Sequence, residues 1–275
     1  MTTYDTATML PLGEVFQSPH STPWHHQIAQ ANTVLLTQVG SGLHGVHTPD
    51  QDDRDEMGVC IEPPEVMLGH DRFDLYEFRS QAQHVRSGPG DLDLNVYGLS
   101  KFTKLLAAGN PMVLMLLFAP RSEVVRIRWP GIDLRERRDM FISRAAGARF
   151  LGYLERQRER FRGSLSQRTN RPELVEKYGY DSKFAYHALR LGLQGIELMT
   201  TGEINLPMLE PHRQYLLRVR RGEFSREDVD RRLDSVHADL EAAVTASRLP
   251  EAADWPAVSA WCAQTYRTWW EETGQ

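Results

Sequence analysis

Residues 34–61 read VLLTQVGSGLHGVHTPDQDDRDEMGVCI, and the interpretation of this stretch decides the fold. An apolar run leads into Gly40-Ser41-Gly42-Leu43-His44-Gly45, which has the spacing of a dinucleotide-binding turn. That turn requires its last glycine to open a helix, whereas Pro49 falls in the first turns of any such helix and removes a backbone hydrogen bond. The acids that follow would also repel a pyrophosphate. The sequence therefore argues against a dinucleotide-binding fold.

Two further motifs fail on the same stretch. A P-loop needs Gly-Lys-Ser/Thr after the turn, and none follows. A calcium loop counted from Asp50 would place Asp55 where glycine is needed and Ile61 where the bidentate Glu is needed.

A magnesium and triphosphate site agrees with both parts of the stretch. Gly40 and Ser41 can offer backbone N–H groups and a hydroxyl to phosphate oxygens. Asp53 and Asp55 lie two residues apart, so in an extended segment both side chains point to one side and can bind the same cations. Magnesium prefers oxygen ligands and is usually shared between carboxylates and substrate phosphates.

The composition is that of an ordinary globular protein. With 275 residues the chain can form one large domain or two modest ones, and its net charge of −5 creates no overall field that attracts nucleic acid. No apolar run approaches the roughly 18–20 residues that span a bilayer, and the N-terminus lacks a signal-peptide pattern. Cys60 and Cys262 cannot form a disulfide framework. We therefore expect a cytoplasmic protein without a membrane partner.

The two parts of the chain differ in their expected secondary structure. Before about residue 125, hydrophobic alternation and turn residues predict helices at 21–32 and 99–111 and strands at 33–39, 57–64, 73–80 and 91–98, while 111–118 fits a helix or a strand. Beyond about residue 131 the pattern predicts helices around 134–162, 171–178, 183–200, 225–246 and 254–272. Pro130 and Gly131 indicate a boundary between them.

The stretch 40–59 resembles the signature of the DNA polymerase beta nucleotidyltransferase superfamily, most closely its stand-alone branch in bacteria and phages. That branch has Gly-Ser-x-x-x-Gly, then Thr-Pro, then Ser-Asp-x-Asp followed by Arg-Gly-Val. This chain has Met57 in place of the Arg and one extra residue before the first acid, so that Asp52 is an alternative to Asp53. The matching positions are Gly40, Ser41, Gly45, Thr48, Pro49, Asp53, Asp55, Gly58 and Val59.

The segment 91–111, DLDLNVYGLSKFTKLLAAGNP, carries the same resemblance. It is similar to the family's strand with a third acid, followed by Tyr-x-Leu-x-Lys-Phe and Gly-Asn-Pro. Asp93 takes the place of the third acid, and Asp91, on the same face of the strand, is the alternative.

The segment 177–192, KYGYDSKFAYHALRLG, resembles the family's Gly-Tyr-Asp-x-Lys-x-Ala-x-His-x-x-Arg-Leu segment. Lys183, His187 and Arg190 have the spacing i, i+4 and i+7, which places them on one helical face. Two permanent cations beside an imidazole can bind phosphate oxygens. Asp181 and Ser182 stand where the helix cap belongs.

The resemblance implies an α/β (α+β) fold: a nucleotidyltransferase core with a mixed β-sheet flanked by helices in residues 1–130, and a helical domain in residues 131–275 that closes the cleft. The implied reaction moves a nucleoside monophosphate from an NTP, such as ATP, to an acceptor hydroxyl and releases pyrophosphate.

The resemblance also implies roles for single residues. Asp53 and Asp55 would hold two Mg²⁺ ions, or Mn²⁺ in their place, and Asp93 would join one ion and help to deprotonate the acceptor. The residues expected to bind the nucleotide are Gly40, Ser41, Lys183, His187 and Arg190.

The acceptor stays open between an RNA 3′ end, a protein side chain and a small molecule, and so do the preferred NTP and the oligomeric state. The alternative function is a catalytically silent nucleotide- or RNA-binding protein that uses the same cleft. The presence of all three acids favours the enzyme.

Overall fold

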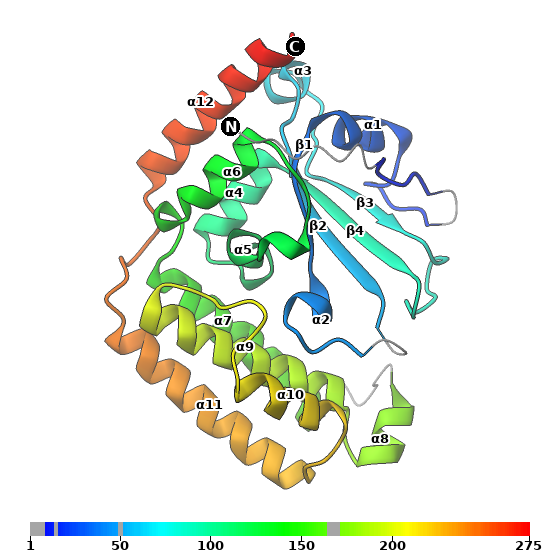
Figure 1. The fold of residues 1–275 in the computed structure, drawn as a ribbon, viewed down its shortest axis with the longest axis vertical. Helices are drawn as coiled ribbons and strands as arrows, with labels where there is room; N and C mark the ends of the chain where they lie inside the picture. Colours follow the sequence, from blue (N-terminus) through cyan, green and yellow to red (C-terminus); the bar gives the residue numbers. More distant parts are fainter. Residues whose placement is uncertain (1–8, 14–15, 49–51, 164–170) are drawn as a thin grey trace. The chain divides into compact units, whose positions relative to one another are not determined.

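The computed structural model describes residues 9–13, 16–48, 52–163 and 171–275 (Figure 1). Contacts divide the chain into two compact units. The sheet unit comprises Met1–Ala107, Val113–Phe141 and Asp254–Gln275, and the helical unit comprises Ala108–Met112 and Ile142–Ala253. The domain boundary expected at residue 130 stays a prediction, because this division describes packing and does not show which parts fold independently.

The sheet unit contains one mixed sheet of five strands in the order β3-β4-β2-β1-β5, which confirms the α/β class (Figure 1). The neighbours β2 and β4 run parallel, and the other neighbouring pairs are antiparallel. The strands are β1 (Thr33–Gln38), β2 (Arg54–Cys60), β3 (Leu75–Arg79), β4 (Leu92–Gly98) and β5 (Val124–Ile127).

The strand β2 begins three residues earlier than the sequence predicted. The apolar pattern starts at Met57, but Arg54, Asp55 and Glu56 also pair with β4. Their charged side chains hide the strand from an analysis based on hydrophobicity, while the backbone of β4 supplies the hydrogen bonds that extend it.

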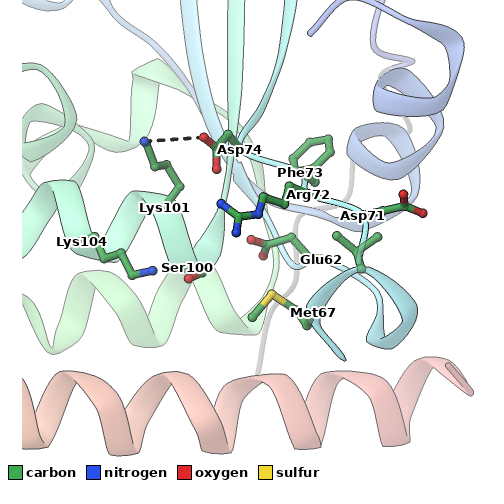
Figure 2. Close-up of a pocket in the computed structure, with 10 residues that line it drawn as sticks. Glu62, Met67, Asp71, Arg72, Phe73, Asp74, Ser100, Lys101 and Lys104 are labelled. Atoms are coloured by element: carbon green, nitrogen blue, oxygen red, sulfur yellow. Dashed lines mark ion pairs between the residues drawn. The ribbon is translucent and has the colours of Figure 1, made fainter. Parts of the chain in front are cut away.

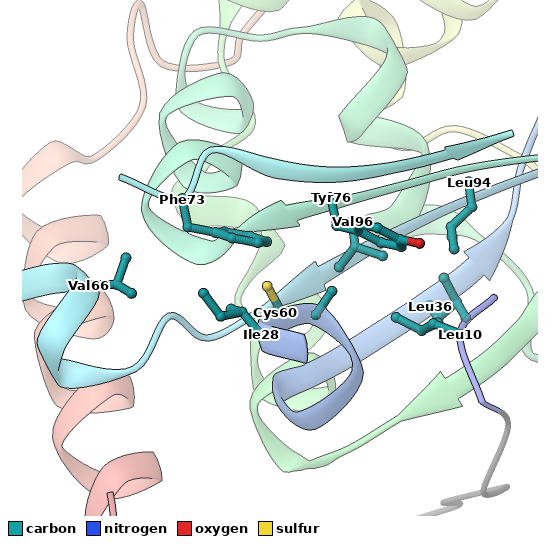
Figure 3. Close-up of a cluster of buried hydrophobic side chains, with 10 residues drawn as sticks. Leu10, Ile28, Leu36, Cys60, Val66, Phe73, Tyr76, Leu94 and Val96 are labelled. Atoms are coloured by element: carbon teal, nitrogen blue, oxygen red, sulfur yellow. The ribbon is translucent and has the colours of Figure 1, made fainter. Parts of the chain in front are cut away.

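A hydrophobic core joins the sheet to α1 (Pro23–Asn32), which lies on one face (Figure 3). Leu94 and Val96 of β4 point into this core, so alternation places Asp93 on the opposite face of the sheet. The buried members of the core are Leu10, Ile28, Ala29, Leu36, Cys60, Val66, Phe73, Tyr76, Leu94 and Val96.

Helices of the same unit lie on the other side of the sheet, where α4 contacts β4 and β2 and α6 contacts β1 (Figure 1). Residues 111–118, whose sequence fitted either a helix or a strand, form the helix α5 (Pro111–Phe118). Within the described residues no single helix is long and apolar enough to cross a bilayer, although α4 and α5 taken together as a bent pair meet that criterion. The other helical elements of this unit are α2 (Gly40–Leu43), α3 (Pro64–Leu68), α4 (Leu99–Ala107), η1 (Arg121–Glu123), α6 (Trp129–Glu136), η2 (Arg138–Met140) and α12 (Trp255–Thr273). The helix α5 begins in the helical unit and continues into this one.

The helical unit is built around α9 (Ser182–Thr201), whose inner face is apolar and buried. This helix packs against α7, α10 and α11, and the shorter α8 also contacts it. The other helices are α7 (Arg144–Arg162), α8 (Pro172–Tyr178), α10 (His212–Arg220) and α11 (Arg226–Ala246). Of these, α10 was not predicted, since its nine residues are mostly polar.

The chain leaves the sheet unit after Phe141 and returns to it at Asp254. At the return point, the Asp254 N–H donates a hydrogen bond of 2.9 Å to the Met140 carbonyl oxygen. The two crossing points therefore lie side by side.

A buried carboxylate, Glu62, connects three elements of the sheet unit just beyond the end of β2. Its Oε2 accepts hydrogen bonds from the Leu99 N–H (2.9 Å) and the Tyr266 hydroxyl (2.6 Å), at the start of α4 and on α12. The Trp270 indole N–H donates to the Glu62 carbonyl oxygen at 3.0 Å. Burial raises the pKa of Glu62, although these hydrogen bonds partly oppose the shift.

The raised pKa of Glu62 predicts how stability depends on pH. Above the ordinary value of 4.5 the folded protein holds this proton more tightly than the unfolded chain, so stability falls as pH rises through the raised pKa. Glu62→Gln keeps an acceptor oxygen and cannot titrate, so we expect this part of the pH dependence to disappear. Urea midpoints measured from pH 4.5 to about 8 test this expectation, with the exposed Glu65→Gln as the matched control. A Glu62→Gln profile with the slope of the parent protein contradicts it.

Candidate active site

Three carboxylates, which we call the acidic cluster, meet at the start of β2 and β4. One carboxylate oxygen from each of Asp53, Asp55 and Asp93 lies within 4.8 Å of those of the other two, and all three residues are half-buried. Asp55 and Asp93 are direct partners in the parallel pairing, and Asp53 lies one position before β2. Two oxygens on opposite sides of a Mg²⁺ ion are about 4 Å apart, so the size and the ligand chemistry of the cluster fit this ion.

Gly40 places the glycine turn directly against the acidic cluster. The preceding Val39 N–H donates to the Asp55 carbonyl oxygen at 2.8 Å, and Gly40 has a φ of +70°. A Cβ on Gly40 would lie only 2.0 Å from Asp55 Oδ2. Both its conformation and this close approach therefore require glycine. Ser41 follows as the second residue of the short helix α2.

The carboxylate of Asp93 is held by side chains from the chain that links β3 to β4. Gln81 Nε2 donates to Oδ1 at 2.9 Å, and the Ser87 hydroxyl donates to Oδ2 at 3.1 Å. Arg79 Nη1 lies 3.7 Å from Oδ2. Such contacts orient a metal ligand. The sequence analysis missed Gln81 and Ser87, because an irregular linker has no periodic pattern that would single them out.

Asp52, the alternative to Asp53, is engaged elsewhere. It is buried, and its Oδ2 accepts a hydrogen bond from the Thr48 N–H at 2.7 Å and lies 3.7 Å from His47 Nδ1. This carboxylate is therefore engaged by Thr48 and His47 and is not part of the acidic cluster. Pro49, which fills a position of the resembled motif, lies outside the described residues.

Asp91, the alternative to Asp93, closes a turn. It accepts hydrogen bonds from the Ser80 hydroxyl (2.7 Å) and the Gly88 N–H (3.0 Å). The bond from Ser80, followed by that from Gly88, lowers the pKa of Asp91. Like Asp52, it lies outside the acidic cluster, so the geometry favours Asp93 as the third ligand.

The cations predicted to bind phosphate lie in the helical unit, on α9. Lys183 and Arg190 are near His187, and Arg171 and Arg220 also act on it, so we call these five residues the His187 cluster. Burial, followed by the positive charges of Arg190, Lys183, Arg171 and Arg220, holds the pKa of His187 well below its ordinary value of 6.5. The imidazole is therefore neutral at pH 7 and surrounded by four cations.

Local contacts fix the start of α9 and the position of Arg190. Asp181 caps the helix by accepting hydrogen bonds from the N–H groups of Lys183 (3.0 Å) and Phe184 (3.2 Å). Of the two residues expected at the cap, Asp181 and not Ser182 is therefore the N-cap. Arg190 is 5% exposed and donates to Gln194 Oε1 at 2.8 Å.

Arg171 and Arg220 were not selected from the sequence. Arg171 Nη1 lies 3.6 Å from Asp181 Oδ2, and the Arg220 guanidinium stacks over the ring of Tyr186. Neither residue belongs to α9, so the helical spacing that selects Lys183, His187 and Arg190 could not predict them.

Comparison with known proteins identifies a family for most of the chain. The model of a family described as the RNA repair pathway DNA polymerase beta family matches residues 22–264. A 38.9 kDa protein of the nrdC–mobD intergenic region of Enterobacteria phage T4 is 27% identical over 132 residues, which are 47% of this chain and 38% of that protein. The chain thus matches less than half the length of this relative.

Among solved structures, a nucleotidyltransferase-like protein from Exiguobacterium sibiricum 255-15 is similar at 14% sequence identity. The alignment covers 81% of this chain and 72% of that protein, with a TM-score of 0.30.

The acidic cluster predicts a divalent-cation site that single substitutions remove. We expect Asp53→Asn, Asp55→Asn and Asp93→Asn each to weaken Mn²⁺ binding at least about tenfold, because each removes one charged ligand. Gly40→Ala should do the same, since its Cβ displaces the Asp55 carboxylate.

Electron paramagnetic resonance titration of free Mn²⁺ measures this binding, and circular dichroism verifies folding. Asp91→Asn is the matched control, because this acid lies directly before β4 and outside the cluster. If Asp91→Asn lost Mn²⁺ while Asp93→Asn retained it, the assignment of the third ligand would be wrong.

Proposed function

The chain belongs to the RNA repair pathway DNA polymerase beta family, and on this premise we propose that it is a metal-dependent nucleotidyltransferase. It transfers a nucleoside monophosphate from an NTP to an acceptor hydroxyl and releases pyrophosphate. The observation that carries the proposal is the convergence of Asp53, Asp55 and Asp93 beside the close-packed Gly40. Three carboxylates with oxygens this close can share a divalent cation, which in a nucleotidyltransferase also binds the substrate phosphates.

The reaction forms one bond and breaks one bond at the α-phosphorus of the NTP. The acceptor oxygen attacks this phosphorus, the bond to the bridging oxygen of the β-phosphate breaks, and pyrophosphate leaves with the bond's electrons. Asp93 accepts the proton of the acceptor hydroxyl, while Gln81 and Ser87 hold its carboxylate in position. Asp53, Asp55 and Asp93 would hold Mg²⁺ or Mn²⁺, which neutralises charge on the phosphates and orients the reacting oxygens.

The phosphates of the NTP are bound by two kinds of group. Gly40 offers its N–H, and Ser41 offers its N–H and hydroxyl to the β- and γ-phosphates. Lys183, His187 and Arg190, which the resemblance marks as phosphate-binding residues, are a separate part of this proposal and are tested below on their own. Four cations act on the His187 imidazole, and a polyphosphate is a ligand of complementary charge.

RNA is the first acceptor to test, because the family description places its members in an RNA repair pathway. A 3′-terminal hydroxyl of RNA presents the attacking oxygen that the reaction needs. A protein side chain and a small alcohol present the same chemistry and are further arms of the test.

The cysteines Cys60 and Cys262 are free, which agrees with action in a reducing compartment such as the cytoplasm.

We expect nucleotide transfer to require the acidic cluster. The protein is incubated with each α-labelled NTP, Mg²⁺ or Mn²⁺, and RNA with a 3′-hydroxyl or a blocked 3′ end, and then with a cell extract as source of other acceptors. Asp53→Asn and Asp55→Asn should lower labelling and pyrophosphate release at least about a hundredfold, whereas Asp91→Asn should retain most of the activity.

The same assay separates the enzyme from the alternative of a catalytically silent binder. Titration calorimetry measures NTP affinity with and without Mg²⁺. Metal-dependent NTP binding together with no labelled product and no pyrophosphate release in any arm shows a binding protein and refutes the enzyme.

The His187 cluster predicts a separate effect on NTP affinity. Lys183→Gln and Arg220→Gln each remove one charge beside His187, and we expect the Kd for NTP to rise roughly tenfold in each variant. Mn²⁺ binding should stay unchanged. Titration calorimetry measures the Kd, and Arg213→Gln, a cation paired with Glu210 elsewhere in the helical unit, is the control. Equal affinity in all three variants would assign the cluster a purely structural role.

A further inference from the structure

A pocket lies just beyond the ends of β2 and β4, whereas the acidic cluster lies at their starts. Figure 2 shows this pocket. It has a volume of about 460 Å³, which is within the usual range for small-molecule sites. Its wall includes Glu62, just past the end of β2, and Ser100, just past the end of β4. Asp55 and Glu62 are seven residues apart along extended chain, which corresponds to about 20 Å. The pocket is therefore distinct from the acidic cluster.

Three cations face the space of this pocket. Lys101 and Lys104 are spaced i and i+3 on α4 and lie on one side, and Arg72 comes from the segment between α3 and β3 (Figure 2). Lys101 is paired with Asp74 at 3.6 Å. Within the parts of the chain that the structure describes, neither Arg72 nor Lys104 has an ion pair or a hydrogen bond from its side chain.

The acids around the pocket do not neutralise these two cations. Figure 2 shows the carboxylate of Asp71 turned away from the side on which the Arg72 guanidinium and Lys104 lie. Asp74 is occupied by Lys101. The carboxylate of Glu62 belongs to the wall of the pocket. Its Oε2 accepts two hydrogen bonds, and its Oε1 packs so closely against Gly98 that a side chain there would collide with it.

The opposite wall of the pocket is apolar. Val66 and Met67 of α3 line it, and Met67 is partly exposed. A ligand that fits both walls has an anionic end for the cations and a less polar body for the methionine. Arg72 can bind two phosphate oxygens at once, and Lys104 adds a point charge.

From this arrangement we propose that the pocket binds a phosphomonoester, with the phosphate held by Arg72 and Lys104 and the body of the ligand against Met67. The phosphate can belong to a free mononucleotide or to the terminal nucleotide of an RNA strand, since both present the same dianion and an adjoining nucleoside. The distance from the acidic cluster makes this ligand a different molecule, or a different part of one, from the triphosphate that reacts. The proposal does not depend on nucleotidyl transfer.

The test uses the full chain in buffer with a chelator, so that the acidic cluster holds no metal. The probes are inorganic phosphate, AMP, and a short oligoribonucleotide with either a 5′-phosphate or a 5′-hydroxyl. Titration calorimetry measures their affinities for the parent protein, for the double variant Arg72→Gln/Lys104→Gln and for Arg267→Gln. Arg267 is an exposed cation on α12 outside the pocket and serves as the matched control.

We expect at least one phosphate probe to bind the parent protein and Arg267→Gln alike, and to bind the double variant roughly tenfold or more weakly. The bound probe should also protect Lys104 from acetylation by acetic anhydride, quantified by peptide mass spectrometry. Binding of AMP points to a small phosphomonoester, and binding of the 5′-phosphorylated oligoribonucleotide alone points to a strand end; both support the proposal.

Three results overturn it: no phosphate probe binds the parent protein, the double variant binds the probes as well as the control does, or the oligoribonucleotides are the only probes that bind and the 5′-hydroxyl form binds as tightly as the phosphorylated one. Because the acidic cluster holds no metal in these experiments, none of these results affects the test of nucleotidyl transfer.

Discussion

The parallel pairing of β2 with β4 is the constraint on which the two sites of the sheet unit depend. Parallel neighbours begin at the same edge of a sheet and end at the same opposite edge. Asp55 therefore lies beside Asp93 at one edge, and the residues that follow both strands, Glu62 and Ser100, meet at the other. An antiparallel arrangement of the same two strands would have separated the acids by the length of a strand.

The acids could be selected from the sequence because a family resemblance added to local patterns. Spacing alone predicts that Asp53 and Asp55 share one side of an extended segment, whereas the resemblance selected Asp93, and the three acids do converge in space. Contacts between segments far apart in the sequence leave no local pattern. The hydrogen bonds of Gln81 and Ser87 to Asp93, and the charges of Arg171 and Arg220 near His187, could therefore be found only in the folded chain. The start of β2 was missed because its charges mask its pairing. The roles assigned to these residues remain predictions.

The acidic cluster illustrates how a rigid scaffold holds side chains that repel one another. The three carboxylates, with oxygens within 4.8 Å of one another, repel one another when all are ionised. Backbone pairing fixes Asp55 and Asp93, the N–H of Val39 fixes the turn against Asp55, and Gly40 leaves no space between turn and carboxylate. These backbone contacts hold the three acids close together.

The hydrogen bond between Asp254 and Met140 has an architectural consequence. A segment whose two ends are adjacent can be exchanged for another of different length without stretching the scaffold that carries it. Residues 142–253, which make up most of the helical unit, meet this condition. Replacing them by a short tether would show whether the sheet unit folds and binds Mn²⁺ without them.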